Sequence, residues 1–309
     1  MKKAIITGST GLVGIGLANK IMNSGVDVLC LGSKERTQEE LVGLFGRKVD
    51  YLALPLESFS QTQNQDKLAE WSANSDCTFY HLAWRGLAKL SDGSIEDQMR
   101  NAYYSAFAVQ VAKQIGCQKF VNVGSTQESY YDYFLSRPDV TRYEYGQSEY
   151  SIAKAASRDM CKIQAYLSKI DYIHVRLSVP LDFTLKSGGF ISNTLKTILS
   201  GSEYDPPVSK NAYDIVSLDD VAHSLFLLGK SGQNKADYYV GPSMPLLLTE
   251  LFDYFSKLKR KKDITETNAR ITNSKKLPVH AFDNSLLQKH TGFSPSDSYV
   301  TLAQQKMNL

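Results

Sequence analysis

Three glycines near the start of the chain constrain its fold more than any other feature. The apolar run at residues 3–7 leads into Gly8, Gly11 and Gly14, and an apolar stretch with helical spacing follows from Leu17. This order predicts a strand, a tight turn and a helix. The turn directs backbone N–H groups and a helix N-terminus toward one point, which favours a bound phosphate. The spacing is G-x-x-G-x-x-G, and the alternative interpretation is a glycine-rich turn that binds nothing.

Length and charge exclude several classes of protein. The chain has 309 residues, enough for a large core, and its net charge of +3 gives no reason to expect nucleic acid. Its apolar runs all fall short of the roughly 20 residues that a membrane span needs. The N-terminus leads directly into a strand, so we expect no signal peptide. The four cysteines form no metal or redox motif, which favours a cytoplasmic protein.

Strand and helix patterns alternate through the first half of the chain. Strands are predicted at Lys3–Thr7, Val26–Leu31, Val49–Leu54, Thr78–Leu82, Lys119–Val123 and Tyr172–Leu177. Helices are predicted at Leu12–Ser24, Thr37–Gly46, Gln65–Asn74, Ser94–Ile115 and Tyr150–Ser168. Short apolar strands separated by helices indicate an α/β fold, a doubly wound parallel sheet of the Rossmann type.

The regular alternation ends after Pro180. Further helices are predicted at Phe190–Leu199, Leu218–Leu228, Leu246–Leu258 and Ser285–His290, with a strand at Tyr213–Val216. We expect a dinucleotide-binding domain at 1–178 that also receives about 212–240. Residues 179–211 and 241–309 then form a smaller mixed C-terminal substrate lobe, which covers the carboxyl ends of the strands.

A tyrosine and a lysine four residues apart form the second strong feature. Tyr150 and Lys154 share one face of a predicted helix, so their side chains can converge. A nearby Lys⁺ favours the phenolate and therefore lowers the pKa of a tyrosine. The predicted strand Lys119–Val123 ends in Gly-Ser-Thr, which places hydroxyl groups at the same edge of the sheet. One such hydroxyl can hold a substrate oxygen while Tyr150 moves a proton. Taken alone, the pair is more often a surface feature than a catalytic one.

Together these motifs resemble the extended short-chain dehydrogenase/reductase superfamily, and within it the nucleotide-sugar epimerases, dehydratases and 4-keto-reductases. The matching motifs are Thr7–Gly14 (T-G-x-x-G-x-x-G), Phe79–Ala83 (H-L-A), Asn101, Thr126, Tyr150 with Lys154, and Val216–Val221 (V-D-D-V). The resemblance covers nearly the whole chain. It implies a catalytic set of Thr126, Tyr150 and Lys154, and a homodimer formed through helices Ser94–Ile115 and Tyr150–Ser168.

The resemblance also implies where a nicotinamide dinucleotide binds. The implied residues are Thr7, Gly8, Thr10, Gly11, Leu12, Val13, Gly14, Gly32, Ser33, Lys34, Arg36, Leu54, Leu56, Leu82, Ala83, Trp84, Asn101, Val123, Tyr150, Lys154, Leu177 and Val179. NAD enzymes usually carry an acidic residue at the end of the second strand, where this chain has Gly32. Lys34 and Arg36 follow it and suit a 2′-phosphate. We therefore expect NADP rather than NAD; a solvated loop that accepts either is the alternative.

The substrate side is less well marked. The residues expected there are Trp84, Arg85, Thr126, Gln127, Ser178 and Phe190, and Glu128 is expected to point the same way. His81 and His174 are interpreted as packing residues, and no cluster has metal-ligand spacing. Many relatives grip the substrate diphosphate with an arginine before the V-D-D element, and this chain has none at residues 211–218. Arg85, Lys186 or Lys210 is the predicted replacement.

These observations predict an NADP(H)-dependent oxidoreductase acting on a small-molecule substrate, a nucleotide-activated 4-keto-6-deoxyhexose. One alternative is a 4-epimerase that oxidises and re-reduces the same carbon with a retained cofactor. The alternative from another class is a non-catalytic, NADP-binding redox sensor. The presence of a proton donor argues against the sensor.

Overall fold

A computed structural model describes residues 1–86, 91–139, 147–186, 188–205, 212–259 and 277–296. Its centre is a seven-stranded sheet in the order β10-β6-β5-β4-β1-β2-β3, in which neighbouring strands all run parallel. The strands are β1 (Lys3–Thr7), β2 (Asp27–Gly32), β3 (Asp50–Ala53), β4 (Cys77–His81), β5 (Lys119–Val123), β6 (Asp171–Leu177) and β10 (Asp237–Val240).

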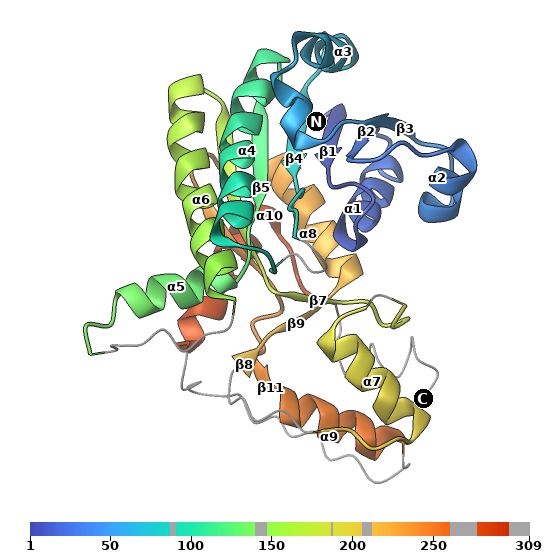
Figure 1. Cartoon of the computed structure of the whole chain (residues 1–309), viewed down its shortest axis with the longest axis vertical. Helices are drawn as coiled ribbons and strands as arrows, with labels where there is room; N and C mark the ends of the chain where they lie inside the picture. Colours follow the sequence, from blue (N-terminus) through green and yellow to red (C-terminus); the bar gives the residue numbers. More distant parts are fainter. Residues whose placement is uncertain (87–90, 140–146, 187, 206–211, 260–276, 297–309) are drawn as a thin grey trace.

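Helices cover both faces of this sheet (Figure 1). One face packs against α1 (Leu12–Met22), α2 (Gln38–Phe45), α8 (Leu218–Ser231) and α10 (Ser285–Thr291). The other packs against η1 (Leu56–Ser60), α3 (Thr62–Ser72), α4 (Ile95–Gln114) and α6 (Ser148–Ser168). Capping boxes at Thr37 and Ser94 set the starts of α2 and α4, since each side chain accepts a hydrogen bond from a backbone N–H group in the first turn of its helix. The predicted doubly wound fold is confirmed.

Two elements of this domain were not predicted. The edge strand β10 pairs with β6 in the register Asp237↔His174. It is short and follows a loop, so its sequence carries no clear alternation. The helix α5 (Gln127–Leu135) follows β5 directly and contains Tyr130, Tyr131 and Tyr133, residues that are poor helix formers. Tertiary contacts rather than local propensity therefore decide both elements.

A smaller lobe lies beyond the carboxyl ends of the strands (Figure 1). In it β7 (Val179–Leu181) pairs with β9 (Ile215–Ser217), and β8 (Ala212–Tyr213) pairs with β11 (Leu246–Leu247). The helices α7 (Phe190–Ser200) and α9 (Leu248–Lys259) pack together around Leu195 and Phe252. A turn of 3-10 helix, η2 (Val279–Phe282), lies against Tyr239.

The prediction of a single strand at Tyr213–Val216 is wrong. Two strands of different sheets replace it, and Asp214 lies between them. The buried carboxylate of Asp214 accepts hydrogen bonds from the Tyr239 hydroxyl and from the backbone N–H groups of Ser243 and Met244. These contacts turn the chain at Asp214 and tie the small lobe to the end of β10. Among the described residues, no helix has the length and hydropathy required to cross a membrane.

Candidate active site

A cavity of about 1100 Å³ opens at the carboxyl ends of β1, β2, β4 and β5. β1 leads to β2 and β3 on one side of the sheet, whereas β4, β5 and β6 lie on the other. The cavity therefore lies where the strand order reverses, which is where open α/β sheets bind their ligands. Beyond the end of β6, the lining continues with Ser178 and with Pro180 of the smaller lobe.

The glycine turn forms one wall and fits a pyrophosphate. Gly8 has a φ of +67°, and an added Cβ would lie 2.9 Å from the backbone nitrogen of Ala83. A Cβ on Gly14 would lie 2.3 Å from the carbonyl oxygen of Gly8, so any side chain there would close the turn. The turn is held by the Thr7 hydroxyl, which accepts hydrogen bonds from the N–H groups of Leu82 and Ala83. The backbone cradle that a dinucleotide needs is therefore present.

Nearly all the residues predicted to bind the cofactor line this cavity. They are Thr7, Gly8, Thr10, Gly11, Leu12, Val13, Gly14, Gly32, Ser33, Lys34, Leu54, Leu56, Leu82, Ala83, Trp84, Asn101, Val123, Tyr150, Lys154 and Leu177. Arg36 and Val179 are not part of the lining. Val179 instead belongs to β7 and pairs with β9, so its backbone is directed into the smaller lobe.

The end of β2 shows a feature that the sequence pattern did not reveal. The hydroxyl of Tyr51, on β3, lies where a side chain at Gly32 would start, 2.3 Å from an added Cβ. The same hydroxyl donates a 2.6 Å hydrogen bond to the carbonyl oxygen of Lys34. Burial raises the pKa of Tyr51, and the nearby charge of Arg36 acts against that shift. Tyr51 therefore fills the space of the missing acidic residue and anchors the loop that carries both cations.

Tyr150 and Lys154 both reach the opposite wall of the cavity. The Lys154 ammonium donates a 3.1 Å hydrogen bond to the carbonyl oxygen of Val123 and lies 3.8 Å from the centre of the Trp84 ring. Burial lowers the pKa of Lys154 to about 8, while the charge of Glu128 acts in the other direction. Burial also raises the pKa of Tyr150, and a hydrogen bond from the Ser125 side chain opposes that rise.

The expectation that Lys154 lowers the pKa of Tyr150 is therefore wrong for this structure. Two physical causes explain the difference. Tyr150 is only 9% exposed, so desolvation disfavours the phenolate, and the charge of Glu128 acts in the same direction. In addition, the ammonium is held against Trp84 and the Val123 carbonyl rather than beside the phenol oxygen.

The structure brings Ser125, rather than Thr126, to the cavity wall beside Tyr150. Thr126 precedes the first turn of α5, and its N–H group donates a 3.0 Å hydrogen bond to the carbonyl oxygen of Leu177. This bond directs the chain away from the cavity one residue after Ser125. The signal was present in the Gly-Ser-Thr sequence, but which hydroxyl faces the cavity depends on the turn after β5.

Asn101 braces the segment that follows the H-L-A motif. Its side-chain amide accepts a hydrogen bond from the N–H group of Arg85 and donates one to the carbonyl oxygen of the same residue, both at 2.8 Å. The indole N–H group of Trp84 donates to Gln98, and the ring meets Tyr150 edge to face. These contacts hold Trp84 over Lys154. His81, also in the motif, is buried between the hydroxyls of Thr7 and Ser105, as a packing residue would be.

The other predicted substrate residues divide into two groups. Arg85 and Ser178 line the cavity, but Gln127 and Phe190 do not. The Arg85 guanidinium is 83% exposed and pairs with Glu57 of η1, beside the part of the lining formed by Leu54 and Leu56. The expectation that Glu128 points to substrate is wrong, because its side chain is fully buried. Phe190 is exposed and contacts Phe252 within the small lobe.

Two further candidates add no support. Lys186 is exposed and does not line the cavity, and Lys210 lies outside the described residues. In the ranges that the structure describes, no group of three or more His, Cys, Asp or Glu residues is arranged to hold a metal ion.

Comparison with known proteins agrees with this geometry. The sequence profile of the NAD dependent epimerase/dehydratase family matches residues 4–241. No curated protein sequence matches the chain.

Solved structures share the fold at low sequence identity. The UDP-N-acetylglucosamine 4-epimerase from Bacillus cereus is 16% identical with a TM-score of 0.73, over 99% of this chain and 95% of that chain. A dTDP-glucose 4,6-dehydratase double mutant from Streptomyces venezuelae with NAD bound is 15% identical with a TM-score of 0.73, and the match covers 98% of this chain and 95% of that chain. The UDP-glucose 4-epimerase from Thermotoga maritima, with UDP-glucose, is 15% identical with a TM-score of 0.70, and the match covers 99% of this chain and 98% of that chain. The profile match spans more than half of the sequence, so the chain belongs to the NAD dependent epimerase/dehydratase family.

Proposed function

We propose that the protein is an NADPH-dependent reductase of a nucleotide-activated 4-keto-6-deoxyhexose. The observation that carries the proposal is that Ser125, Tyr150 and Lys154 share one cavity with the glycine turn. A dinucleotide on that turn can extend toward the two hydroxyls and the ammonium, and a sugar can reach them from the side of Ser178. The proposal includes the predicted division into two domains. The dinucleotide-binding domain is formed by 1–178 with about 212–240, and the substrate lobe by 179–211 with 241–309.

The chain supplies the proton and the orientation for such a reaction. When bound, the cofactor supplies the hydride that adds to the carbonyl carbon of the sugar. Tyr150 gives its hydroxyl proton to the carbonyl oxygen as negative charge develops there. Ser125, to which we assign the role first predicted for Thr126, donates a hydrogen bond to the same oxygen. Lys154 binds the ribose beside the nicotinamide through its ammonium group.

Tyr150 is ready to act as the acid of a reduction. Burial holds the pKa of the phenol above its ordinary value, so Tyr150 carries its proton at neutral pH. A 4-epimerase would first use the same residue as a base, and the positive charge of an oxidised nicotinamide would then favour the phenolate. Whether NADPH is consumed therefore decides between the two functions.

The choice of NADP rests on the end of β2. A carboxylate at position 32, which would bind the ribose hydroxyls of NAD, is blocked by the Tyr51 hydroxyl. Lys34 lines the cavity, and Arg36 lies close enough to act on Tyr51. These two cations flank a single acid, Glu35, and the strand end itself carries no carboxylate, which suits the 2′-phosphate of NADP. Related structures carry NAD, and they supply no argument for the 2′-phosphate.

The nucleotide-sugar part of the proposal rests on the family and on what related structures bind. Solved relatives carry UDP-glucose, UDP or UDP-glucuronic acid. Trp84, placed over Lys154 and against Tyr150, offers a ring on which a sugar can stack. Arg85 lines the cavity, but its exposed guanidinium is paired with Glu57, so we do not assign it to the diphosphate.

We also infer a homodimer through α4 and α6. The two helices pack together and carry exposed apolar side chains, including Tyr103, Ile163, Tyr166 and Leu167. A second copy would cover them. A Tyr166→Glu, Ile163→Glu variant should sediment as a monomer while the wild type sediments as a dimer. A cytoplasmic location is a further proposal, which the four free, buried cysteines support.

One experiment separates the candidate functions. Purified protein is mixed with NADPH and a panel of 4-keto-6-deoxyhexoses linked to UDP, dTDP, GDP or CDP, and in a parallel series with the oxidised cofactor and the corresponding unoxidised sugar nucleotides. Both the absorbance of NADPH and the sugar products are followed. A reductase consumes NADPH in a one-to-one ratio with the sugar. An epimerase inverts an unoxidised sugar nucleotide without net consumption, and a redox sensor binds NADPH without turnover. Tyr150→Phe is the control for the chemical step.

A further inference from the structure

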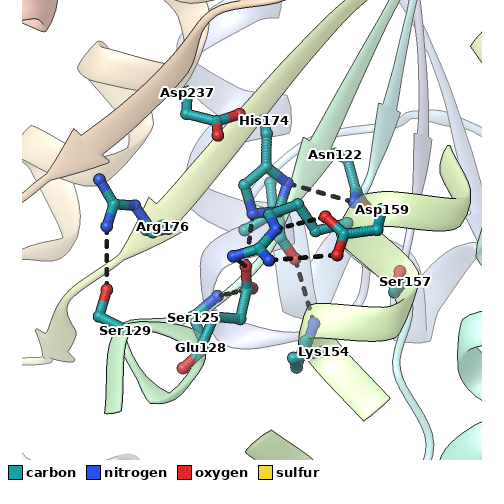
Figure 2. A network of polar contacts seen from close by, with 12 residues as sticks. Asn122, Ser125, Glu128, Ser129, Lys154, Ser157, Asp159, His174, Arg176 and Asp237 are labelled. Carbon is teal, nitrogen blue, oxygen red and sulfur yellow. Dashed lines mark hydrogen bonds and ion pairs between the residues drawn. The ribbon is translucent and has the colours of Figure 1, made fainter. Parts of the chain in front are cut away.

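Behind the Ser125–Tyr150 wall lies a network of buried polar side chains that the proposed reaction does not use. It joins α5, β5, β6 and α6, and Figure 2 shows Glu128 and His174 near its centre. Both side chains have no exposed surface. A buried carboxylate is costly unless hydrogen bonds and charges compensate it, so its contacts require an explanation.

The carboxylate of Glu128 uses both of its oxygens. Oε2 lies 2.7 Å from Nε2 of His174, and Oε1 accepts a 2.8 Å hydrogen bond from the backbone N–H group of Ser125. On the far side of the ring, Nδ1 of His174 lies 3.3 Å from the Tyr172 hydroxyl and 3.4 Å from the Asn122 amide nitrogen. A chain of contacts thus runs from the interior of the sheet to the backbone of Ser125.

Gly124 provides independent support that this arrangement is specific. A Cβ at position 124 would lie 2.1 Å from Oε1 of Glu128 and 2.6 Å from Cε1 of His174. The φ angle of Gly124 is not positive, so backbone conformation does not require glycine there. The requirement is the close approach of the carboxylate and the imidazole to the end of β5.

The charged groups that face Glu128 come from α6. Nη1 of Arg158 lies 4.0 Å from Oε2, although this guanidinium is mainly held by Asp132 and Asp159. The charge of Glu128 also acts on Lys154, where it favours the ammonium, and on Tyr150, where it disfavours the phenolate. Glu128 does not line the cavity, so it reaches these groups from behind.

We propose that Glu128, held by His174, is a positioning residue that fixes the backbone of Ser125 so that the serine hydroxyl faces Tyr150. The proposal rests on the proposed reductase, because it gives Glu128 a role in that reaction. The carboxylate holds the residue at which the chain leaves β5 for α5. Without it, the N–H group of Ser125 loses its partner, and the hydroxyl is held by the backbone only through the 3.2 Å hydrogen bond that it accepts from the N–H group of Gln127.

The main test compares two substitutions of Glu128 with a matched control. Glu128→Ala removes the acceptor of the Ser125 N–H group, and kcat should fall about 10- to 100-fold with little change in the Kd for NADPH. Glu128→Gln keeps an oxygen for that N–H group but removes the charge, so kcat should fall less. Asp132→Asn is the control, since Asp132 lies on the same helix and also bonds Arg158 but does not contact Ser125. This control variant should keep kcat within about twofold of the wild-type value.

The pH profile distinguishes positioning from a general loss of stability. In Glu128→Gln the basic limb of kcat should move to lower pH, because the anion that disfavours the Tyr150 phenolate is gone. A merely structural role would lower Tm without moving this limb. If Glu128→Ala lowers Tm but keeps kcat and the basic limb of the wild type, the proposal is overturned.

A measurement without substrate keeps this result separate from the proposed function. Amide hydrogen exchange at Ser125, followed by NMR, should be slow in the wild type and in Glu128→Gln, and faster in Glu128→Ala by about 10-fold or more. Unchanged exchange in Glu128→Ala would refute the hydrogen bond on which the proposal depends. If the wild type reduces no keto-sugar nucleotide, the reductase proposal fails, and the exchange still decides whether Glu128 holds Ser125.

Discussion

The two walls of the cavity are built in opposite ways. The wall that suits a pyrophosphate comes from one continuous segment, Gly8 to Gly14, and it works through its backbone. The wall that suits the reaction is assembled from the ends of β5 and β6, from α6 and from the segment around Trp84. The first requires only that side chains be absent, whereas the second requires several side chains to be held in place. Substitutions should therefore act on binding at the first wall and on rate at the second.

The largest effect is expected for Tyr150→Phe. The variant lacks the proton donor, and general acid catalysis contributes roughly 10²–10⁴-fold, so kcat should fall on that order. The Kd for NADPH should stay nearly unchanged because the glycine turn is intact. Steady-state kinetics on the keto-sugar nucleotide that the panel identifies, with fluorescence titration of NADPH, checks both quantities. Activity within about threefold of the wild type would remove Tyr150 from the reaction.

A second prediction uses the cost of burying Lys154. Burial lowers the pKa of this lysine from 10.5 to about 8, so between these values the unfolded chain binds more protons than the folded one. The contribution of Lys154 to stability should therefore rise with pH across that window, by ~3 kcal/mol at about 1.4 kcal/mol per pKa unit. Burial raises the pKa values of Cys30 and Cys161, so these thiols act in the opposite direction, and only a comparison with a variant that lacks Lys154 isolates its contribution.

The matched variant is Lys154→Met, which has no titrating group at this position. Below pH 8 the variant should be more stable than the wild type, because no charge is buried. The loss of the hydrogen bond to Val123 offsets part of this gain. This advantage should shrink as pH rises from 8 toward 10.5. Urea unfolding of both proteins at several pH values measures the difference, and a difference independent of pH would contradict the burial of a charged Lys154.

Sequence alone predicted the first wall well and the second only in part. Each glycine of the turn could be placed from its spacing, because strand, turn and helix are contiguous. The choice between Ser125 and Thr126 could not, because it depends on a hydrogen bond between Thr126 and Leu177, which are 51 positions apart. Local patterns do not contain such contacts.

The same limit explains the other errors. Glu128 looked like a substrate contact because it follows the strand end, but its partner His174 lies on β6. Asp214 broke a predicted strand because its hydrogen-bond donors come from beyond β10. The role of Tyr51 was not predicted, because it pairs with Cys30 and its hydroxyl reaches the space beside Gly32 only through the pairing of β2 with β3. In each case a polar or aromatic side chain takes a role that only strand pairing or helix packing defines.

At the end of β2, beside the first wall, Lys34→Ala with Arg36→Ala should weaken NADPH binding far more than NADH binding. A hydrogen bond to a charged group contributes about 1.5–3 kcal/mol, so the loss for NADPH should be about 10-fold or more. Lys48→Ala, which removes an exposed cation before β3, is the control and should change neither Kd. Isothermal titration of both cofactors provides the measurement. A wild type that prefers NADH would show that this loop does not bind a 2′-phosphate.

A smaller effect is expected from rebuilding the acidic site at the end of β2. Gly32→Asp alone should not gain affinity for NADH, because the Tyr51 hydroxyl occupies the space of the new side chain. Combined with Tyr51→Ala, the same aspartate should improve NADH binding several-fold, since a carboxylate can then reach the ribose hydroxyls. Tyr51→Ala alone is the control. It measures how losing the hydrogen bond to the Lys34 carbonyl oxygen affects NADH binding when no aspartate fills the vacated space. If Gly32→Asp improves NADH binding equally with and without Tyr51, then Tyr51 does not block the site.

The smallest effect is expected for Arg85→Ala, at the boundary between the two walls. Its guanidinium is 83% exposed and pairs with the half-exposed Glu57, and such surface pairs contribute only about 0–1 kcal/mol. The KM for the nucleotide sugar should therefore change by no more than about threefold. A buried diphosphate without a cation would be costly, so a large rise in KM would show that Arg85 leaves Glu57 and binds the substrate. Isothermal titration of the wild type and of Arg85→Ala with UDP, dTDP, GDP and CDP separates these outcomes. If none of the nucleotides binds the wild type at millimolar concentration, the substrate carries no diphosphate, and an unactivated keto sugar becomes the candidate.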